Sequence, residues 1–159
     1  MSTAEMARAV EAFILREARL LDRGEFEAWL ELYAPQGIYW MPSQPHLSDP
    51  LGVPSIMYED HAILSMRVQR LLEARALVLT PMPRTTHLVS NIEVEDTDGD
   101  EISAQAAFIC VEHQGERQRM FSGRHAYQFA RENGSLRIKM KRVDLLNCDG
   151  VHAPITIPL

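Results

Sequence analysis

Two residue types that often carry chemistry are scarce in this sequence. Among 159 residues there are only two cysteines and two lysines. The cysteines, Cys110 and Cys148, have no Cys-x-x-Cys spacing and no repeated Cys/His pattern, so they indicate no zinc site and no disulfide framework. We expect both to be small apolar core residues of a protein in a reducing compartment, the cytoplasm.

A membrane-spanning run and an excess of basic residues are also missing. No run of about 18 apolar residues occurs. The N-terminal segment carries Glu5 and Glu11 and does not have the basic and apolar regions of a secretory signal. The formal net charge is −6, whereas nucleic-acid binding depends mainly on a basic surface. We therefore expect neither membrane nor nucleic-acid binding.

Local motifs for catalysis and metal binding are absent as well. The sequence has no Gly-rich phosphate loop, and Phe121-Ser122-Gly123 has no glycine two residues before the serine, as a nucleophile elbow requires. No histidine forms a His-x-x-x-His or Glu-x-x-His pair. The paired Cys-x-His and Cys-x-x-His elements of a Rieske cluster are not both present, because Cys110-x-x-His113 has no Cys-x-His element to accompany it. The histidines are His46, His61, His87, His113, His125 and His152. We expect no catalytic, cofactor or metal site in this chain.

The first half of the sequence has helical periodicity. Ser2 and Glu5 fit a capping box and Gly24 fits a helix C-terminus, which predicts a helix over about residues 3–23. Its apolar positions are Met6, Val10, Phe13, Ile14, Leu20 and Leu21. Phe26, Trp29, Leu30 and Tyr33 continue the pattern in a shorter helix, which Pro35 should end.

A short strand over 37–41 is expected next, followed by a surface loop over the proline-rich residues 42–54. A helix should begin at Glu59 and Asp60, which are favourable in a first turn. The pattern places Ile63, Met66, Leu71 and Leu72 on its buried side and Arg67, Arg70 and Arg75 on its outer side.

The second half predicts four strands over about 86–95, 102–113, 119–131 and 134–147. Turn signals separate them at 96–100, at 114–116 and at Asn133-Gly134. Such short connections require antiparallel neighbours. The sequence therefore predicts an α+β fold, with N-terminal helices packed on one face of a curved, mainly antiparallel sheet, in a single domain over 1–159.

The fourth strand contains a change of phase. One face should carry Leu136, Ile138 and Met140 and the other Arg137, Lys139 and Lys141, but the next apolar residues are Val143 and Leu145. The alternation therefore slips by one at Lys141–Arg142, which predicts a β-bulge there and a bent strand.

Two features leave alternatives open. Asp60, His61 and His87 could form an acid/base pair, or Asp60 could cap a helix while His87 hydrogen-bonds at a sheet end, which the sequence favours. The first alternative would make the chain a stand-alone isomerase, dehydratase or cyclase. A pocket without a base in reach would instead indicate a small-ligand binding module.

The charge distribution is the second open feature. Acidic residues gather at one hairpin (Glu93, Glu95, Asp96, Asp98, Asp100 and Glu101) and basic residues at another (Arg131, Arg137, Lys139, Lys141 and Arg142). With Trp40, the basic strand is expected near a sheet edge. The two groups are either solvated faces or parts of a protein interface.

Several stretches together resemble the small (β) subunit of bacterial aromatic-ring-hydroxylating dioxygenases. They are, in chain order, EARLLDRGEFEAWLELYAPQGIYWMP, YEDHAILSMRVQRL, PRTTHLVSNIEVE, FSGRHAYQF and LRIKMKRVDLLN. The resemblance spans almost the whole chain. It implies a cone-shaped fold of the nuclear-transport-factor-2-like superfamily.

The resemblance also implies a role. In that family three small subunits form a trimer that supports three large subunits, and the large subunit holds the Rieske [2Fe-2S] cluster and a mononuclear Fe(II). The complex dihydroxylates an aromatic compound to a cis-dihydrodiol, and no catalytic residue is expected in this chain. The last stretch, CDGVHAPITIPL, differs from the aromatic-ended tail of biphenyl- and naphthalene-type small subunits, which suggests a branch that acts on aromatic acids.

Overall fold

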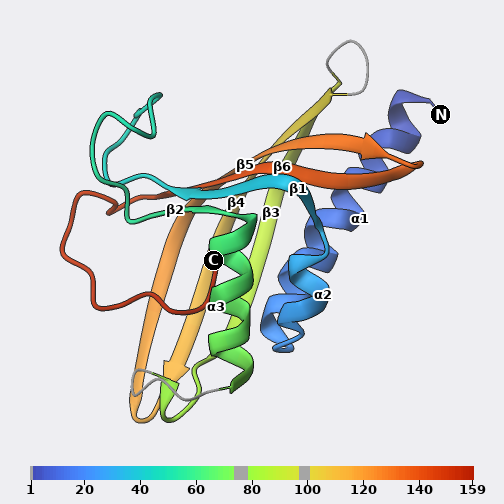
Figure 1. Ribbon diagram of the computed structural model, residues 1–159. Coiled ribbons are helices and arrows are strands. Elements are labelled where there is room, and N and C mark those ends of the chain that lie inside the picture. Colours follow the sequence, from blue (N-terminus) through green and yellow to red (C-terminus); the bar gives the residue numbers. More distant parts are fainter. Residues whose placement is uncertain (1, 74–78, 97–100) are drawn as a thin grey trace.

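The computed structural model describes residues 2–73, 79–96 and 101–159. The first half contains α1 (Thr3–Asp22), α2 (Phe26–Leu30), β1 (Tyr33–Met41), β2 (Met57–Asp60) and α3 (His61–Glu73). The second half contains β3 (Arg84–Asp96), β4 (Glu101–Gln114), β5 (Arg117–Glu132) and β6 (Ser135–Leu145) (Figure 1). The predicted turns at 97–100 and the position of Arg75 lie outside the described residues.

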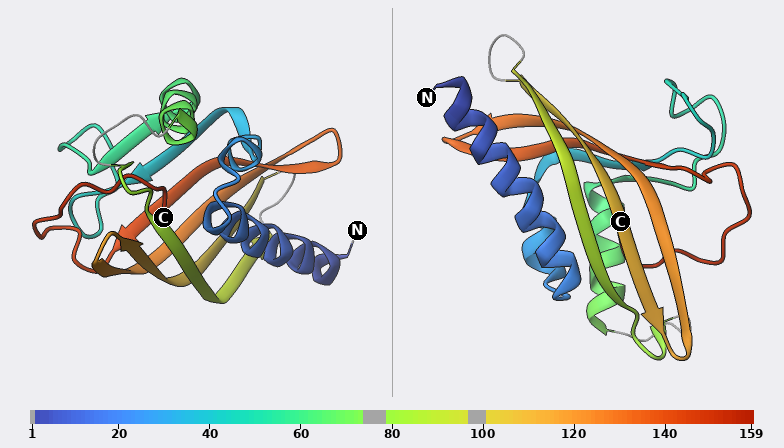
Figure 2. Two further views of the ribbon diagram at one scale, coloured as in Figure 1. Left: turned by 90° about the horizontal axis from the view of Figure 1, so that it is seen from below. Right: turned by 180° about the vertical axis from the view of Figure 1, so that it is seen from behind.

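The strands form one six-stranded sheet in the order β2-β1-β6-β5-β4-β3. All neighbours are antiparallel except β1 and β6, which run parallel. The long strands curve around one side of the helices, so helices and sheet enclose a common core (Figure 2). The α+β fold with a curved, mainly antiparallel sheet is confirmed.

Local sequence signals explain where α1 begins and where two turns form. The side chain of Ser2 accepts a hydrogen bond from the Glu5 amide, and the Glu5 carboxylate accepts one from the Ser2 amide, which completes the capping box. Gly24 follows α1 at a φ of +69°. Asn133 and Gly134 both have positive φ, as a tight hairpin between β5 and β6 requires.

The second helix is shorter than predicted. It ends at Leu30, and Tyr33 belongs to β1 rather than to the helix. Pro35 lies inside β1, between Tyr33 and Ile38, where the pairing of β1 with β6 shifts in register. Proline is tolerated there because an irregular stretch does not need its amide hydrogen.

The prediction for α3 is wrong in its start and in its buried face. Glu59 and Asp60 belong to β2, and the helix begins at His61. Leu64, Val68 and Leu71 are the buried side chains. Of the residues predicted to be buried, Ile63, Met66 and Leu72 are exposed. Leu71 is thus the predicted core residue of this helix that is confirmed.

The strand β6 has the predicted bulge, but it lies nearer the N-terminus of the strand. Gln128 and Phe129 of β5 pair with Met140 and Ile138, which leaves Lys139 as the inserted residue. Met140 is therefore on the outer side, and Lys141 is fully buried beside the core. The expected sheet-edge position is also wrong, because β6 lies between β1 and β5.

The core lies between the helices and the concave side of the sheet. Side chains with no exposed surface come from both layers: Val10, Ile14, Trp29, Leu64, Phe129, Ile138 and Val143. Both cysteines are buried and unpaired, as predicted. Trp40 is also buried, and its indole donates to the Ser55 hydroxyl at 2.9 Å.

Candidate functional site: a polar network inside the core

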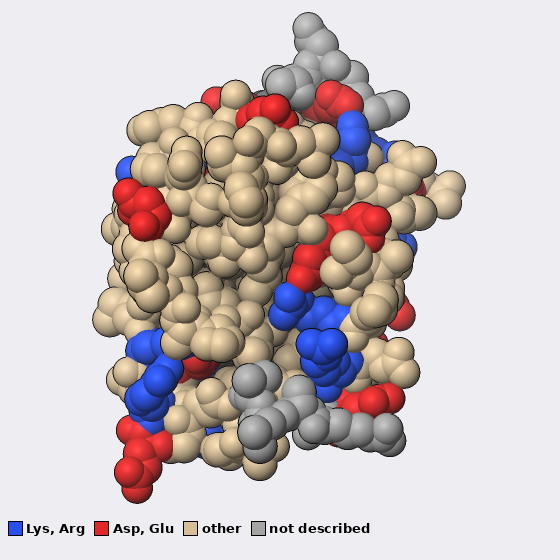
Figure 3. All heavy atoms as spheres, turned by 60° about the vertical axis from the view of Figure 1, so that its left-hand side comes forward, with Lys and Arg blue, Asp and Glu red and all other residues tan. Residues whose placement is uncertain are grey.

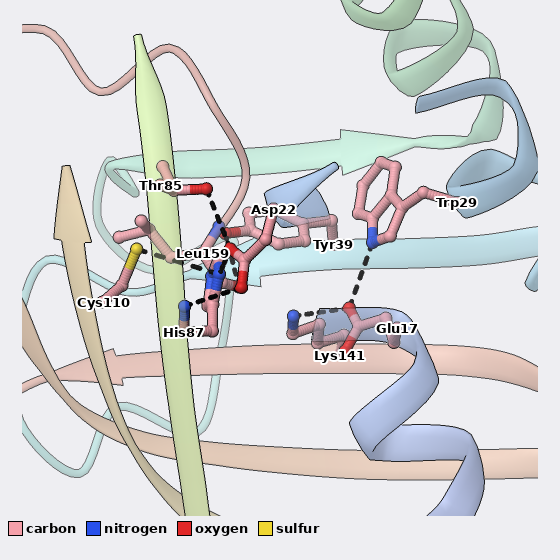
Figure 4. Close-up of polar contacts among 9 residues, drawn as sticks. All are labelled: Glu17, Asp22, Trp29, Tyr39, Thr85, His87, Cys110, Lys141 and Leu159. Atoms are coloured by element: carbon pink, nitrogen blue, oxygen red, sulfur yellow. Dashed lines mark hydrogen bonds and ion pairs between the residues drawn. The ribbon is translucent and has the colours of Figure 1, made fainter. Parts of the chain in front are cut away.

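Charged side chains meet in the interior where the end of α1 crosses β3 and β6 (Figure 4). Asp22, the last residue of α1, contacts two residues of β3. Its carboxylate accepts hydrogen bonds from the Thr85 hydroxyl at 2.9 Å and from the His87 amide at 2.8 Å, and it lies 2.6 Å from His87 Nδ1. Asp22 therefore ties the helix to an edge strand.

A second pair lies one turn earlier on α1. Lys141 Nζ donates to Glu17 Oε1 at 2.5 Å, and the side chain of each residue is 1% exposed. Glu17 also accepts from Trp29 Nε1 at 3.1 Å and from the Tyr127 hydroxyl at 2.7 Å. One carboxylate thus joins α1, α2, β5 and β6.

Burial displaces several pKa values in this network. It lowers the pKa of Lys141, and the Glu17 carboxylate opposes that change. Burial alone would raise the pKa of Asp22, but the hydrogen bonds from His87 and Thr85 outweigh it, so this pKa lies below its ordinary value. Burial raises the pKa of Cys110 to about 12, which makes its thiol unreactive.

A buried histidine extends the network along β5. The ring of His125 stacks on Phe108 with centroids 4.0 Å apart, and Nδ1 lies 3.3 Å from the Tyr127 hydroxyl. Burial lowers the pKa of His125 well below its ordinary value, so the ring stays neutral. Nε2 of His125 and Nε2 of His87 have no hydrogen-bond partner among the described residues.

The predicted acid/base residues are not brought together as a group. Asp60 accepts a hydrogen bond from the Ile63 amide at 3.0 Å, so it caps α3, as the favoured alternative predicts. His61 lies in the same helix, with Nδ1 3.5 Å from the Ser65 hydroxyl. His87 pairs with Asp22 instead. No hydrogen bond or ion pair joins Asp60 or His61 to His87 within the described ranges.

The partners that matter most, Glu17 and Asp22, were missed at the sequence level. Glu17 has a signal that was available: it lies three residues after Ile14 and four before Leu21, on the buried face of α1. A carboxylate on an apolar helix face requires an internal partner. The partner itself, Lys141, is 124 residues away.

The segment after β6 lies against this interior. Tyr39 and Leu159 are joined by a 2.9 Å hydrogen bond from the Leu159 amide to the Tyr39 hydroxyl, and both residues have no exposed surface. Arg119 donates to the carbonyls of Ala153 and Pro154, at 3.1 and 2.5 Å. The core therefore includes Ile155, Ile157 and Leu159 from the stretch CDGVHAPITIPL.

Within the described part of the chain, no group of three or more His, Cys, Asp or Glu side chains is placed to hold a metal ion. The charged groups of the interior neutralise one another in pairs. This arrangement fits a network that holds the helices to the sheet.

The described helices include none with the length and apolar character that crossing a bilayer would need.

The basic strand is not a continuous outer surface. Lys141 faces the core, whereas Lys139 is on the outside and pairs with Glu101 at 2.6 Å. The acidic and basic hairpins therefore contact each other at this point. Arg142 pairs with Asp144 at 2.9 Å and stacks over Trp40.

The six-stranded mixed sheet with helices on its concave side defines an α+β fold. Residues 16–149 match the family described as "Ring hydroxylating beta subunit". The small subunit of 2-halobenzoate 1,2-dioxygenase from Burkholderia cepacia is 35% identical over 153 residues, 93% of this chain and 92% of that protein.

Solved structures agree with this match. The β subunit of benzoate 1,2-dioxygenase from Burkholderia mallei is 28% identical, covers 92% of each chain and has a TM-score of 0.75. A naphthalene 1,2-dioxygenase structure is 17% identical, covers 100% of this chain and 88% of the other, and has a TM-score of 0.83, which shows the fold. The chain belongs to the family of small (β) subunits of aromatic-ring-hydroxylating dioxygenases. A stand-alone isomerase, dehydratase or cyclase is not favoured.

Proposed function

We propose that this chain is the non-catalytic structural subunit of a terminal oxygenase. Residues 1–159 would act as one domain that binds a large subunit carrying the Rieske [2Fe-2S] cluster and the mononuclear Fe(II). Three small subunits would form a trimer that holds three large subunits in the cytoplasm. The observation that carries this proposal is the match to small subunits along residues 16–149.

The interior supports a structural role. A catalytic acid or base must reach a substrate proton, so it needs access to a pocket. Here the Glu17 and Lys141 side chains are 1% exposed and bonded to each other. The Asp22 carboxylate is already bonded to Thr85 and His87. These groups connect elements and do not present free functional atoms.

The surface supports assembly with a partner. Large apolar side chains are exposed on the loop between β1 and β2, on α3 and on the segment after β6: Leu51, Ile63, Met66, Leu72, Leu146 and Val151. The loop and the segment after β6 lie on the same side of the molecule (Figure 1). On the face that Figure 3 brings forward, a broad area lacks charged groups, and acidic and basic groups lie around it. Such surfaces typically mark protein contacts.

We also propose that the complex acts on an aromatic carboxylic acid of the benzoate type. The names of the similar proteins support this: the 35% identical relative belongs to a 2-halobenzoate dioxygenase and the 28% identical structure to a benzoate dioxygenase. The naphthalene enzyme is 17% identical.

Co-expression tests the proposal. The chain should co-purify with a Rieske large subunit of a benzoate-type dioxygenase in equal numbers, and the complex should convert benzoate to a cis-dihydrodiol when supplied with reductase and NADH. Purified alone, it should contain no iron and show no turnover. A chain that remains separate from such a large subunit, or that transforms an aromatic acid by itself, would contradict the structural role. Turnover of naphthalene but not benzoate would contradict only the substrate class.

A further inference from the structure

A surface groove separates α1 from the β5–β6 hairpin, away from the polar network. The hairpin extends past the N-terminal half of α1 (Figures 1 and 2). The end of α2 closes the third side. The groove has a volume of about 590 Å³, which is within the usual range of small-molecule sites, about 300–1,000 Å³.

The floor of the groove is apolar. Met6 and Phe13 contribute from α1 and Leu136 contributes from β6. Phe13 packs edge-on against Phe129, with ring centroids 5.2 Å apart, which fixes the orientation of its ring. Met6 is buried, whereas Phe13 and Leu136 are partly exposed towards the groove. A rigid aromatic ring beside a thioether favours a ligand with an apolar, ring-sized body.

Three arginines line the same groove without a carboxylate partner among the described residues. Arg16 makes no hydrogen bond or ion pair there, and Arg131 contacts only the sulfur of Met6, at 3.5 Å. Arg137 donates to a backbone carbonyl, that of Glu31. The side chain of Glu31 is the one acidic group on the lining.

These three arginines face one groove on a chain in which Asp and Glu outnumber Lys and Arg by 22 to 16. Three other arginines are held by carboxylates: Arg67 by Glu59, Arg119 by Glu112 and Arg142 by Asp144. The groove therefore concentrates positive charge on a protein that is negative overall. Guanidinium groups bind carboxylates with paired, charge-assisted hydrogen bonds.

We propose that this groove binds a small amphipathic carboxylate, with its apolar body on Phe13 and Leu136 and its carboxylate between Arg16 and Arg131. The site does not depend on the proposed role in an oxygenase. The ligand class follows from the pairing of an apolar floor with unpaired guanidinium groups.

A titration of the purified full-length chain tests the site. Benzoate, at concentrations up to about 10 mM, should shift the methyl NMR signals of Met6 and Leu136 in a saturable way. Benzamide has nearly the same shape without the charge, and it should bind at least about tenfold more weakly. Arg16→Gln combined with Arg131→Gln should raise the Kd for benzoate by a similar factor.

The matched control is Arg8→Gln, an exposed arginine on the same helix that does not line the groove. It should leave the Kd unchanged within about twofold. If the double variant fails to fold, Arg16→Gln alone provides the test, since the Arg16 side chain makes no hydrogen bond or ion pair with the described residues that the substitution would remove. Benzamide binding as tightly as benzoate, shifts confined to methyl groups outside the groove, or an unchanged Kd in the folded arginine variant would each overturn the proposal.

Discussion

The buried pair of Glu17 and Lys141 gives the sharpest prediction about folding. Lys141→Met removes the cation but leaves the Glu17 carboxylate in the core, where only Trp29 and Tyr127 still donate to it. Breaking one side of a buried ion pair destabilises a protein by about 3–5 kcal/mol. The total free energy of unfolding of a domain is about 5–15 kcal/mol. Lys141→Met should therefore remove at least about a fifth of the stability.

A substitution of Glu17 shows whether the loss of stability in Lys141→Met comes from the unpaired charge or from lost packing. Glu17→Gln added to Lys141→Met leaves no buried charge in the pair, and the amide oxygen can still accept a hydrogen bond. We expect the double variant to be about 1–2 kcal/mol more stable than Lys141→Met alone. A pure loss of packing would make the double variant equal to the single variant or worse.

Lys139→Met is the matched control in the same strand. Lys139 is 43% exposed and its partner Glu101 is 72% exposed, so solvent screens this pair. Its loss should change stability by less than about 1 kcal/mol. Urea unfolding followed by tryptophan fluorescence gives the midpoint and slope for all four proteins. Equal effects of Lys141→Met and Lys139→Met, or a double variant less stable than Lys141→Met, would contradict a cost that comes from the unpaired buried carboxylate.

Three further predictions concern other parts of the core. Burial holds the pKa of His125 below 6.5, so as the pH falls this histidine takes up a proton in the unfolded chain before it does so in the folded chain. The free energy of unfolding should therefore drop by about 1 kcal/mol between about pH 7.5 and 5.5. His125→Gln should abolish that drop in urea unfolding at the two pH values. Gly123→Ala would place a Cβ 1.9 Å from the carbonyl oxygen of Asp144, so it should destabilise the chain by about 3 kcal/mol or more; thermal unfolding that matches wild type would contradict this geometry. Leu64→Ala should destabilise by about 2–5 kcal/mol and Met66→Ala by about 0.5 kcal/mol or less; equal effects in a denaturant titration would contradict the observed buried face of α3.

Features set by neighbouring residues were predicted well from the sequence. The capping box of Ser2 and Glu5 and the hairpin at Asn133-Gly134 depend on contacts within a few residues, and both are confirmed. The order of β3 to β6 in the meander follows from turn-length connections and is confirmed. Short-range chemistry therefore fixes most of the second half of the fold.

The face of α3 shows where a one-dimensional pattern is insufficient. Leu64, Val68 and Leu71 form one apolar stripe, but Ile63 and Met66 form part of another. Both stripes have helical spacing, so periodicity alone does not decide which one faces the sheet. The approach of β1 and β2 decides it, and their pairing is not local.

The pairing of Glu17 with Lys141 could not be predicted from the sequence, because it also depends on contacts that are not local. A phase slip was visible in β6, but its position depends on the partners Gln128 and Phe129 on β5. Moving the bulge by two residues changes Lys141 from an outer cation to a core cation. Glu17 and Lys141 then meet across 124 residues, a contact that no local motif encodes.

The bulge affects the curvature of β6 but not the side of the sheet on which its other side chains lie. Lys139 has no partner on β5, while Ile138 and Met140 pair with consecutive residues of that strand. Without Lys139, Ile138 would be followed directly by Met140, and both would keep their present partners on β5. All the remaining side chains of β6 would stay on the same side of the sheet as before. Only the curvature that a bulge introduces would be lost. A one-residue difference in length at this point between related chains is compatible with the same core.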